Sequence, residues 1–224
     1  MKLATVLRGL GRYGLFRSAF NQAVLGAVLG LALFCAGSAQ AATTILAFGD
    51  SLTAGYGVTV GESFPVRLES VLKARGHDVR VINAGISGDT TAGGLARLDW
   101  SLADKPDLVL LELGSNDMLR GIDPGSTEAN LDAILQKLTA AKIPVLLCGM
   151  YAARNLGPDY VTRFDAIYPK LAKKYGVALY PFFLDGVALD ASLNQGDGMH
   201  PNPDGVRIVV DRMAPVIEKL LPTS

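Results

Sequence analysis

Short apolar runs alternate with longer segments of helical period along most of the chain. The apolar runs, which we expect to form strands, cover 44–48, 79–83, 108–113, 144–148 and 177–180. Between them, apolar residues recur at the spacing of one helix face, which predicts helices over 64–75, 91–103, 127–141, 159–175 and 203–221. Strands that alternate with helices in this way are typical of βαβ units, and strands this continuously apolar fit a parallel sheet covered on both faces.

Polar residues follow the first run, at the edge of the sheet where sites form in parallel α/β folds. The segment Gly49-Asp50-Ser51-Leu52 places a serine on a strand-to-helix turn, which exposes its hydroxyl as a candidate nucleophile. It is not the G-x-S-x-G elbow, because Thr53 occupies the last position. Taken alone, the serine could equally be a helix cap.

Two further strand ends carry groups that could donate hydrogen bonds. The second run leads into a glycine-rich loop around Gly88, whose free backbone N–H groups could bind an anion or form a tight turn. The third run leads into Gly114-Ser115-Asn116-Asp117, where the asparagine amide could donate to an oxyanion or form an Asx-turn.

A carboxylate and an imidazole lie three residues apart just before the last predicted helix. In Asp197-Gly198-Met199-His200, the aspartate could fix the histidine tautomer while the other ring nitrogen accepts a serine proton. His200 alone could also be an exposed histidine beside a helix start. Together with Ser51 and the donors, however, the pair would complete a nucleophile, a base and an oxyanion site.

Charge is distributed unevenly along the chain. Residues 1–41 contain four basic residues and no acidic one, followed by an apolar stretch over 23–35 and the small-residue site Ala39-Gln40-Ala41. This is the pattern of a secretory signal peptide, cut after Ala41 or Ala42, which leaves the domain 42–224 and predicts a periplasmic or secreted protein. The apolar stretch is too short for a permanent membrane anchor.

Cleavage also changes the composition. The precursor has 21 basic and 21 acidic residues, so loss of the four leaves 17 against 21, a net charge of −4. This balance argues against nucleic-acid binding. Cys148 becomes the single cysteine, and we expect a buried, inert thiol. No Cys/His spacing suits a metal. We expect Trp100, late in a predicted helix, to pack against the sheet.

The four strand-end segments resemble the sequence blocks of the SGNH (GDSL) hydrolases, over essentially all of 44–221. Within that family, the chain is most similar to the thioesterase I/lysophospholipase/arylesterase group. The resemblance implies a three-layer α/β/α, flavodoxin-like fold with a five-stranded parallel sheet. It also implies a serine esterase without cofactor or metal, in which Ser51 is the nucleophile, His200 the general base and acid, and Asp197 its orienting partner. The oxyanion donors would be the N–H groups of Ser51 and Gly88 and the side chain of Asn116.

The expected substrate is a small ester, thioester or lysolipid, and we expect a monomer without stable membrane insertion. Candidate walls of the acyl pocket are Tyr56, Met118, Leu119, Tyr151 and Phe182. Phe182 and its neighbour Phe183 could equally pack in the core. Two alternatives stay open: a carbohydrate acetyl esterase with the same triad, and a non-catalytic, flavodoxin-like domain that binds an anion at Gly85–Thr91.

Overall fold

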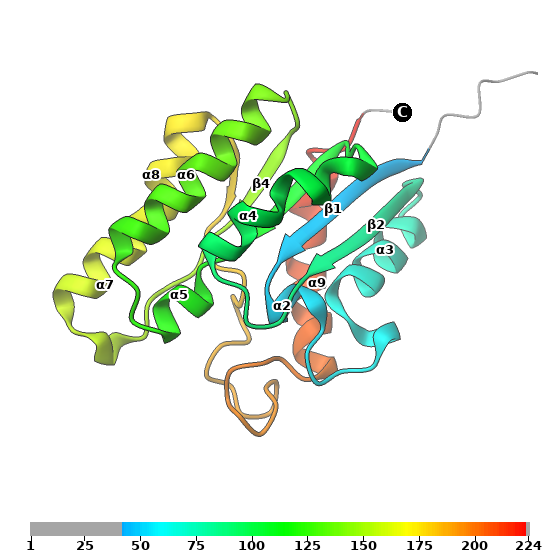
Figure 1. Cartoon of the computed structure of the whole chain (residues 1–224). Coiled ribbons are helices and arrows are strands. Elements are labelled where there is room, and N and C mark those ends of the chain that lie inside the picture. The colour runs from blue at the N-terminus through cyan, green and yellow to red at the C-terminus, as the bar shows by residue number, and fades with distance from the viewer. Residues whose placement is uncertain (1–41, 223–224) are drawn as a thin grey trace, which may run out of the picture. The chain divides into compact units, whose positions relative to one another are not determined.

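Residues 42–222 are described by a computed structural model, in which five strands form one parallel sheet (Figure 1). The strands are β1 (Thr43–Gly49), β2 (Val79–Gly85), β3 (Leu108–Glu112), β4 (Val145–Cys148) and β5 (Ala178–Tyr180). They lie side by side in the order β2-β1-β3-β4-β5. The predicted strands and the parallel sheet are confirmed. The predicted signal peptide, 1–41, lies outside the described residues and stays a prediction.

Helices cover both faces of the sheet. The long helices are α3 (Phe64–Ala74), α4 (Thr91–Ser101), α6 (Pro124–Ala140), α7 (Pro158–Asp165), α8 (Ile167–Tyr175) and α9 (Pro203–Glu218). The short ones are α2 (Ser51–Ala54), α5 (Ser115–Leu119) and the 3-10 turns η1 (Val60–Glu62), η2 (Leu102–Asp104) and η3 (Arg154–Leu156). Helices α3 and α9 pack together on one face, and α4, α6 and α8 on the other (Figure 1). The three-layer flavodoxin-like fold is therefore confirmed.

The strand order creates a crevice at the carboxyl ends of the strands. From β1 the chain crosses through α3 to β2, and from β2 it returns through α4 on the opposite face to β3. The loops that follow the adjacent strands β1 and β3 therefore diverge, which is where α/β sheets bind their ligands. Strands β3 and β4 are buried along their whole length, so the strand ends beneath this crevice are rigid.

Two expectations about helices are wrong. The helix predicted over 159–175 is divided into α7 and α8 at Ala166, because Pro169 lacks the N–H that would bond to the carbonyl of Asp165. Trp100 does not pack against the sheet but is 80% exposed. Helix α4 buries Gly94, Leu98 and Ser101, and a residue two positions after Leu98 points to the opposite side of the helix.

Within residues 42–222, no helix has the length and apolar character that would be needed to cross a bilayer.

Candidate active site

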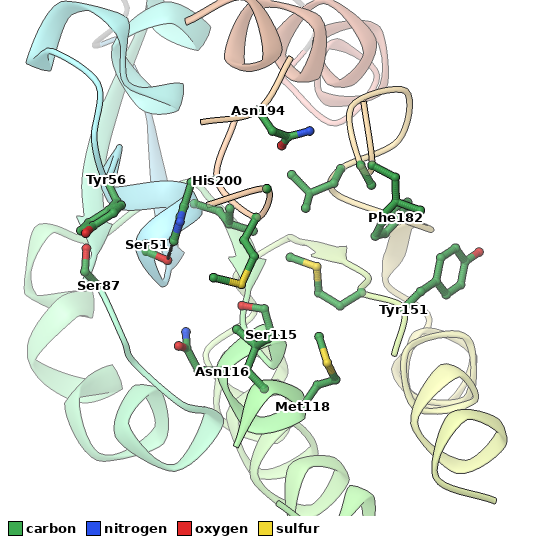
Figure 2. A pocket seen from close by; sticks show the side chains of 18 of the residues that line it. Ser51, Tyr56, Ser87, Ser115, Asn116, Met118, Tyr151, Phe182, Asn194 and His200 are labelled. Carbon is green, nitrogen blue, oxygen red and sulfur yellow. Dashed lines mark hydrogen bonds between the residues drawn. The ribbon is translucent and has the colours of Figure 1, made fainter. Parts of the chain in front are cut away.

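Ser51 lies at the first position of α2, directly after β1. The side chain of Asp50 caps this one-turn helix by accepting the N–H of Leu52 at 3.0 Å. Gly55 ends the helix with φ of +86°, a left-handed conformation that glycine adopts without strain. The turn holds Ser51 9% exposed, with its hydroxyl facing the crevice (Figure 2).

His200 and Asp197 come from the loop between β5 and α9. The Ser51 hydroxyl lies 2.9 Å from His200 Nε2, and His200 Nδ1 lies 2.7 Å from Asp197 Oδ2. The other oxygen of Asp197 accepts the N–H groups of His200 at 3.0 Å and Met199 at 2.9 Å. These backbone bonds, with the imidazole, lower the pKa of Asp197 to about 2. An ionised Asp197 favours the tautomer with its proton on Nδ1, which leaves Nε2 free to accept the serine proton.

The histidine loop is held by a residue that the sequence did not indicate. The N–H of Gln195 donates to the carbonyl of His200 at 2.8 Å. Its side-chain amide donates to the carbonyls of Tyr56 at 2.7 Å and Pro201 at 2.9 Å. The Tyr56 ring in turn packs against the imidazole, with ring centroids 4.6 Å apart (Figure 2). Gln195 therefore ties the loop of His200 to the loop that follows Ser51.

The three residues expected to supply oxyanion donors, Ser51, Gly88 and Asn116, line the same cavity. The Asn116 amide, at the start of α5, donates one N–H to Asp50 Oδ2 at 2.9 Å, which leaves its second N–H available. The hydroxyl of Ser115 donates to the same carboxylate oxygen. The backbone N–H groups of Ser51 and Gly88 make no hydrogen bond to another part of the described chain. Asn116 and the two N–H groups can therefore serve a bound oxygen.

Two buried acids lie beneath the serine. Glu112, at the end of β3, accepts the N–H of Asp50 at 3.1 Å and the hydroxyl of Thr53 at 2.8 Å. Burial and the neighbouring Asp50 carboxylate raise the pKa of Glu112 well above its usual value, which favours the neutral form of Glu112. Burial also raises the pKa of Asp50, but its hydrogen bonds with Ser115, Leu52 and Asn116 oppose that shift. We therefore assign the negative charge of the pair to Asp50.

A cavity of about 360 Å³ opens beside Ser51 and His200 (Figure 2). Its walls include all five predicted pocket residues, Tyr56, Met118, Leu119, Tyr151 and Phe182. Tyr151 and Phe182 form an aromatic pair with centroids 4.8 Å apart, whereas Phe183 is buried in the core. Apolar residues of the β4–η3 and β5–α9 loops complete the walls: Met150, Leu184, Ala188, Leu189 and Met199. The sequence did not indicate the four from the β5–α9 loop.

The other candidate groups lie apart from this cavity. Cys148 is buried in β4, as expected, and burial raises the pKa of its thiol well above the usual value. No cluster of three or more His, Cys, Asp or Glu side chains in the described part of the chain could hold a metal ion. At the N-terminus of α4, the carboxylate of Asp117 already accepts the N–H of Thr91 at 2.8 Å. This negative charge disfavours the alternative in which that terminus binds an anion.

Known proteins resemble this chain over most of its length. The sequence matches the GDSL-like Lipase/Acylhydrolase family over residues 47–208. The thioesterase 1/protease 1/lysophospholipase L1 of Escherichia coli is 44% identical over 184 residues, which cover 82% of this chain and 87% of the relative. The esterase TesA of Pseudomonas aeruginosa is 41% identical over 192 residues, covering 85% and 96%. The solved structure of the SGNH-hydrolase family esterase AlinE4 is 49% identical, with a TM-score of 0.69, and covers 83% of this chain and 100% of that one.

The neutral state of Glu112 predicts a pH-dependent stability. A carboxyl group whose pKa is higher in the folded than in the unfolded protein contributes stability at pH values below the unfolded pKa. That contribution is lost as the pH rises toward the folded pKa. We expect wild type to lose stability relative to Glu112→Gln as the pH rises above about 5, where a glutamate in the unfolded chain is mostly ionised, because glutamine has no proton to release. Urea unfolding at several pH values measures this difference.

Glu69→Gln is the matched control, since hydrogen bonding to Lys73 lowers the pKa of Glu69. Its stability difference from wild type should stay constant over the same pH range. Parallel curves for wild type and Glu112→Gln would contradict a neutral Glu112.

Proposed function

The chain belongs to the GDSL-like lipase/acylhydrolase family and is a carboxylic ester hydrolase, and on this basis we propose that it is an exported serine esterase that forms an acyl-enzyme on Ser51. The observation that carries this proposal is the continuous chain of contacts from the Ser51 hydroxyl through His200 to Asp197, at 2.9 Å and 2.7 Å. These are hydrogen-bond distances that suit a nucleophile, a base and a base-orienting carboxylate.

In the first half of the reaction, Ser51 is acylated. Its Oγ attacks the carbonyl carbon of an ester or thioester while His200 Nε2 takes the hydroxyl proton. The carbonyl electron pair moves onto oxygen, where the N–H groups of Ser51 and Gly88 and the second N–H of Asn116 stabilise the negative charge. When the carbonyl reforms, the bond to the leaving group breaks, and His200 gives its proton to the departing alcohol or thiol.

In the second half, water replaces the leaving group. His200 takes a proton from the water while the water oxygen attacks the carbonyl carbon of the acyl-enzyme. The same donors stabilise the second oxyanion. The bond to Ser51 then breaks, the proton returns to the serine oxygen, and the free carboxylic acid leaves. Asp197 stays ionised and stabilises the imidazolium in both halves.

The cavity supports an acyl chain of several carbons as the substrate group. Met118, Met150 and Leu184 give the walls an apolar character, and an acetyl group would leave most of the 360 Å³ empty. Leu189, 97% exposed at the rim, adds an apolar entrance. These features favour fatty acyl esters, thioesters or lysolipids over the alternative of acetylated carbohydrates.

Export is the remaining part of the proposal. The cationic segment, the apolar stretch and the Ala39-Gln40-Ala41 site at the start of the chain support secretion across a membrane and cleavage.

We predict that Ser51→Ala lowers kcat for a p-nitrophenyl ester by about 10³-fold or more, because it removes the hydroxyl that lies within hydrogen-bond distance of His200 Nε2. A fluorophosphonate should label wild type at Ser51 and leave Ser51→Ala unlabelled by mass spectrometry. The control is Ser126→Ala, an exposed serine of α6, which should match wild type in both assays. Full activity of Ser51→Ala would refute the assignment.

We further predict that kcat/KM rises with acyl length from acetyl, by about fourfold for each methylene that the cavity buries. Leu184→Trp should shift the preferred chain to fewer carbons by filling the cavity, whereas Leu156→Trp, outside the cavity walls, should leave the preference unchanged. A panel of p-nitrophenyl esters from acetyl to palmitoyl, acyl thioesters and acetylated sugars measures this. A sharp acetyl optimum would favour the carbohydrate alternative.

Expression of the whole chain in a Gram-negative bacterium tests export. We expect the osmotic-shock fraction to contain protein that begins at Ala42 or Thr43, by N-terminal sequencing. Protein that keeps Met1 and stays in the cytosol would contradict export.

A further inference from the structure

Arg97 of α4 makes hydrogen bonds to the ends of two strands outside the substrate cavity. Its Nη2 donates to the carbonyl of Gly49 at 2.9 Å, and its Nη1 donates to the carbonyl of Ala84 at 2.9 Å. Its Nε donates to Asp89 Oδ2 at 2.7 Å. One planar group therefore joins the end of β1, the end of β2 and the loop that follows β2.

The guanidinium has little freedom to move. Its central carbon lies 3.9 Å from the centroid of the Phe48 ring, and Phe48 is completely buried in β1. The side chains of Arg97 and Asp89 are only 14% and 12% exposed. Charge-assisted bonds in such a shielded place are stronger than surface ion pairs and have fixed geometry.

The contacts of Arg97 flank two of the proposed oxyanion donors. The Gly49 carbonyl lies two residues before Ser51, and Asp89 directly follows Gly88. Arg120 donates to the carbonyl of Gly88 itself at 2.6 Å. Ser51 follows β1 and Gly88 follows β2. The separation of their N–H groups therefore depends on the contacts between the two strand ends, which are the hydrogen bonds of Arg97 and the bond from the N–H of Ile86 to the Gly49 carbonyl at 3.0 Å.

We propose that Arg97, through Asp89 and the Gly49 carbonyl, is a positioning residue that fixes the Gly88 N–H relative to the Ser51 N–H. This inference rests on the proposed function, because it assigns both groups to the oxyanion site. Arg97 does not line the cavity, so it acts without touching substrate. A displacement of about 1 Å in such a donor costs up to about 100-fold in rate.

The test compares variants of the pair in steady-state hydrolysis of a p-nitrophenyl ester. Arg97→Ala should lower kcat by about 10- to 100-fold and change KM by less than about twofold, since ground-state binding does not use the oxyanion donors. Arg97→Lys should recover only part of kcat, because an ammonium cannot reproduce the planar fork. Asp89→Asn, like Arg97→Ala, should lower kcat.

Added guanidinium ion distinguishes a positioning role of Arg97 from a general role in stability. At millimolar concentration it should raise kcat of Arg97→Ala, while urea at the same concentration should not. The control is Arg75→Gln, whose ion pair with Glu218 at 3.3 Å lies at the C-terminal end of α3, and which should keep wild-type kcat with or without guanidinium.

Circular dichroism melting separates folding from positioning. If Arg97→Ala is unfolded, Gly93→Ala replaces it, because a Cβ on Gly93 would collide with Asp89 Oδ1 and displace the carboxylate. A folded variant with wild-type kcat, or a kcat loss in Arg97→Ala that guanidinium leaves unchanged, would overturn the inference. Ser51→Ala in the same assay distinguishes the cases: if it is inactive while Arg97→Ala is fully active, only the positioning role fails.

Discussion

The carboxylate of Asp50 joins the ends of the adjacent strands β1 and β3. One of its oxygens accepts the N–H of Leu52 and so starts the helix that carries Ser51, while the other accepts hydrogen bonds from Ser115 and Asn116 after β3. The side chain is completely buried, where an unpaired charge would be costly. Three donors offset that cost, and the neutral neighbour Glu112 avoids a second charge. Asp50 therefore fixes the position of the Ser51 turn relative to the amide of Asn116.

The remaining parts of the site come from segments that the sheet alone does not fix. Gly88 follows β2, the edge strand beside β1, and His200 lies in the loop before α9. Each is attached by a polar contact across long sequence distances: Arg97 connects the Gly88 loop to β1, and Gln195 connects the His200 loop to the carbonyl of Tyr56. Polar contacts between distant segments thus hold the proposed site, while apolar residues line its cavity.

The sequence predicted the sheet and most helices because their apolar spacing is regular, and it predicted candidate residues because strand topology brings strand ends together. It could not predict that Trp100 faces solvent, since an aromatic residue is buried by default. Glu112 lies within an apolar strand, Arg97 resembles any charged residue on a helix, and Gln195 has no motif around it. Their contacts depend on tertiary distances that spacing along the chain does not contain.

In the proposed mechanism, three donors, from the short helices α2 and α5 and from the loop after β2, converge on an oxygen held by Ser51. A crystal structure of the protein after reaction with an organophosphonate tests it most directly. We expect phosphorus bonded to Ser51 Oγ, with one phosphonyl oxygen about 2.7–3.1 Å from the N–H nitrogens of Ser51 and Gly88 and from Asn116 Nδ2. An adduct on another residue, or a phosphonyl oxygen directed away from these donors, would contradict the account.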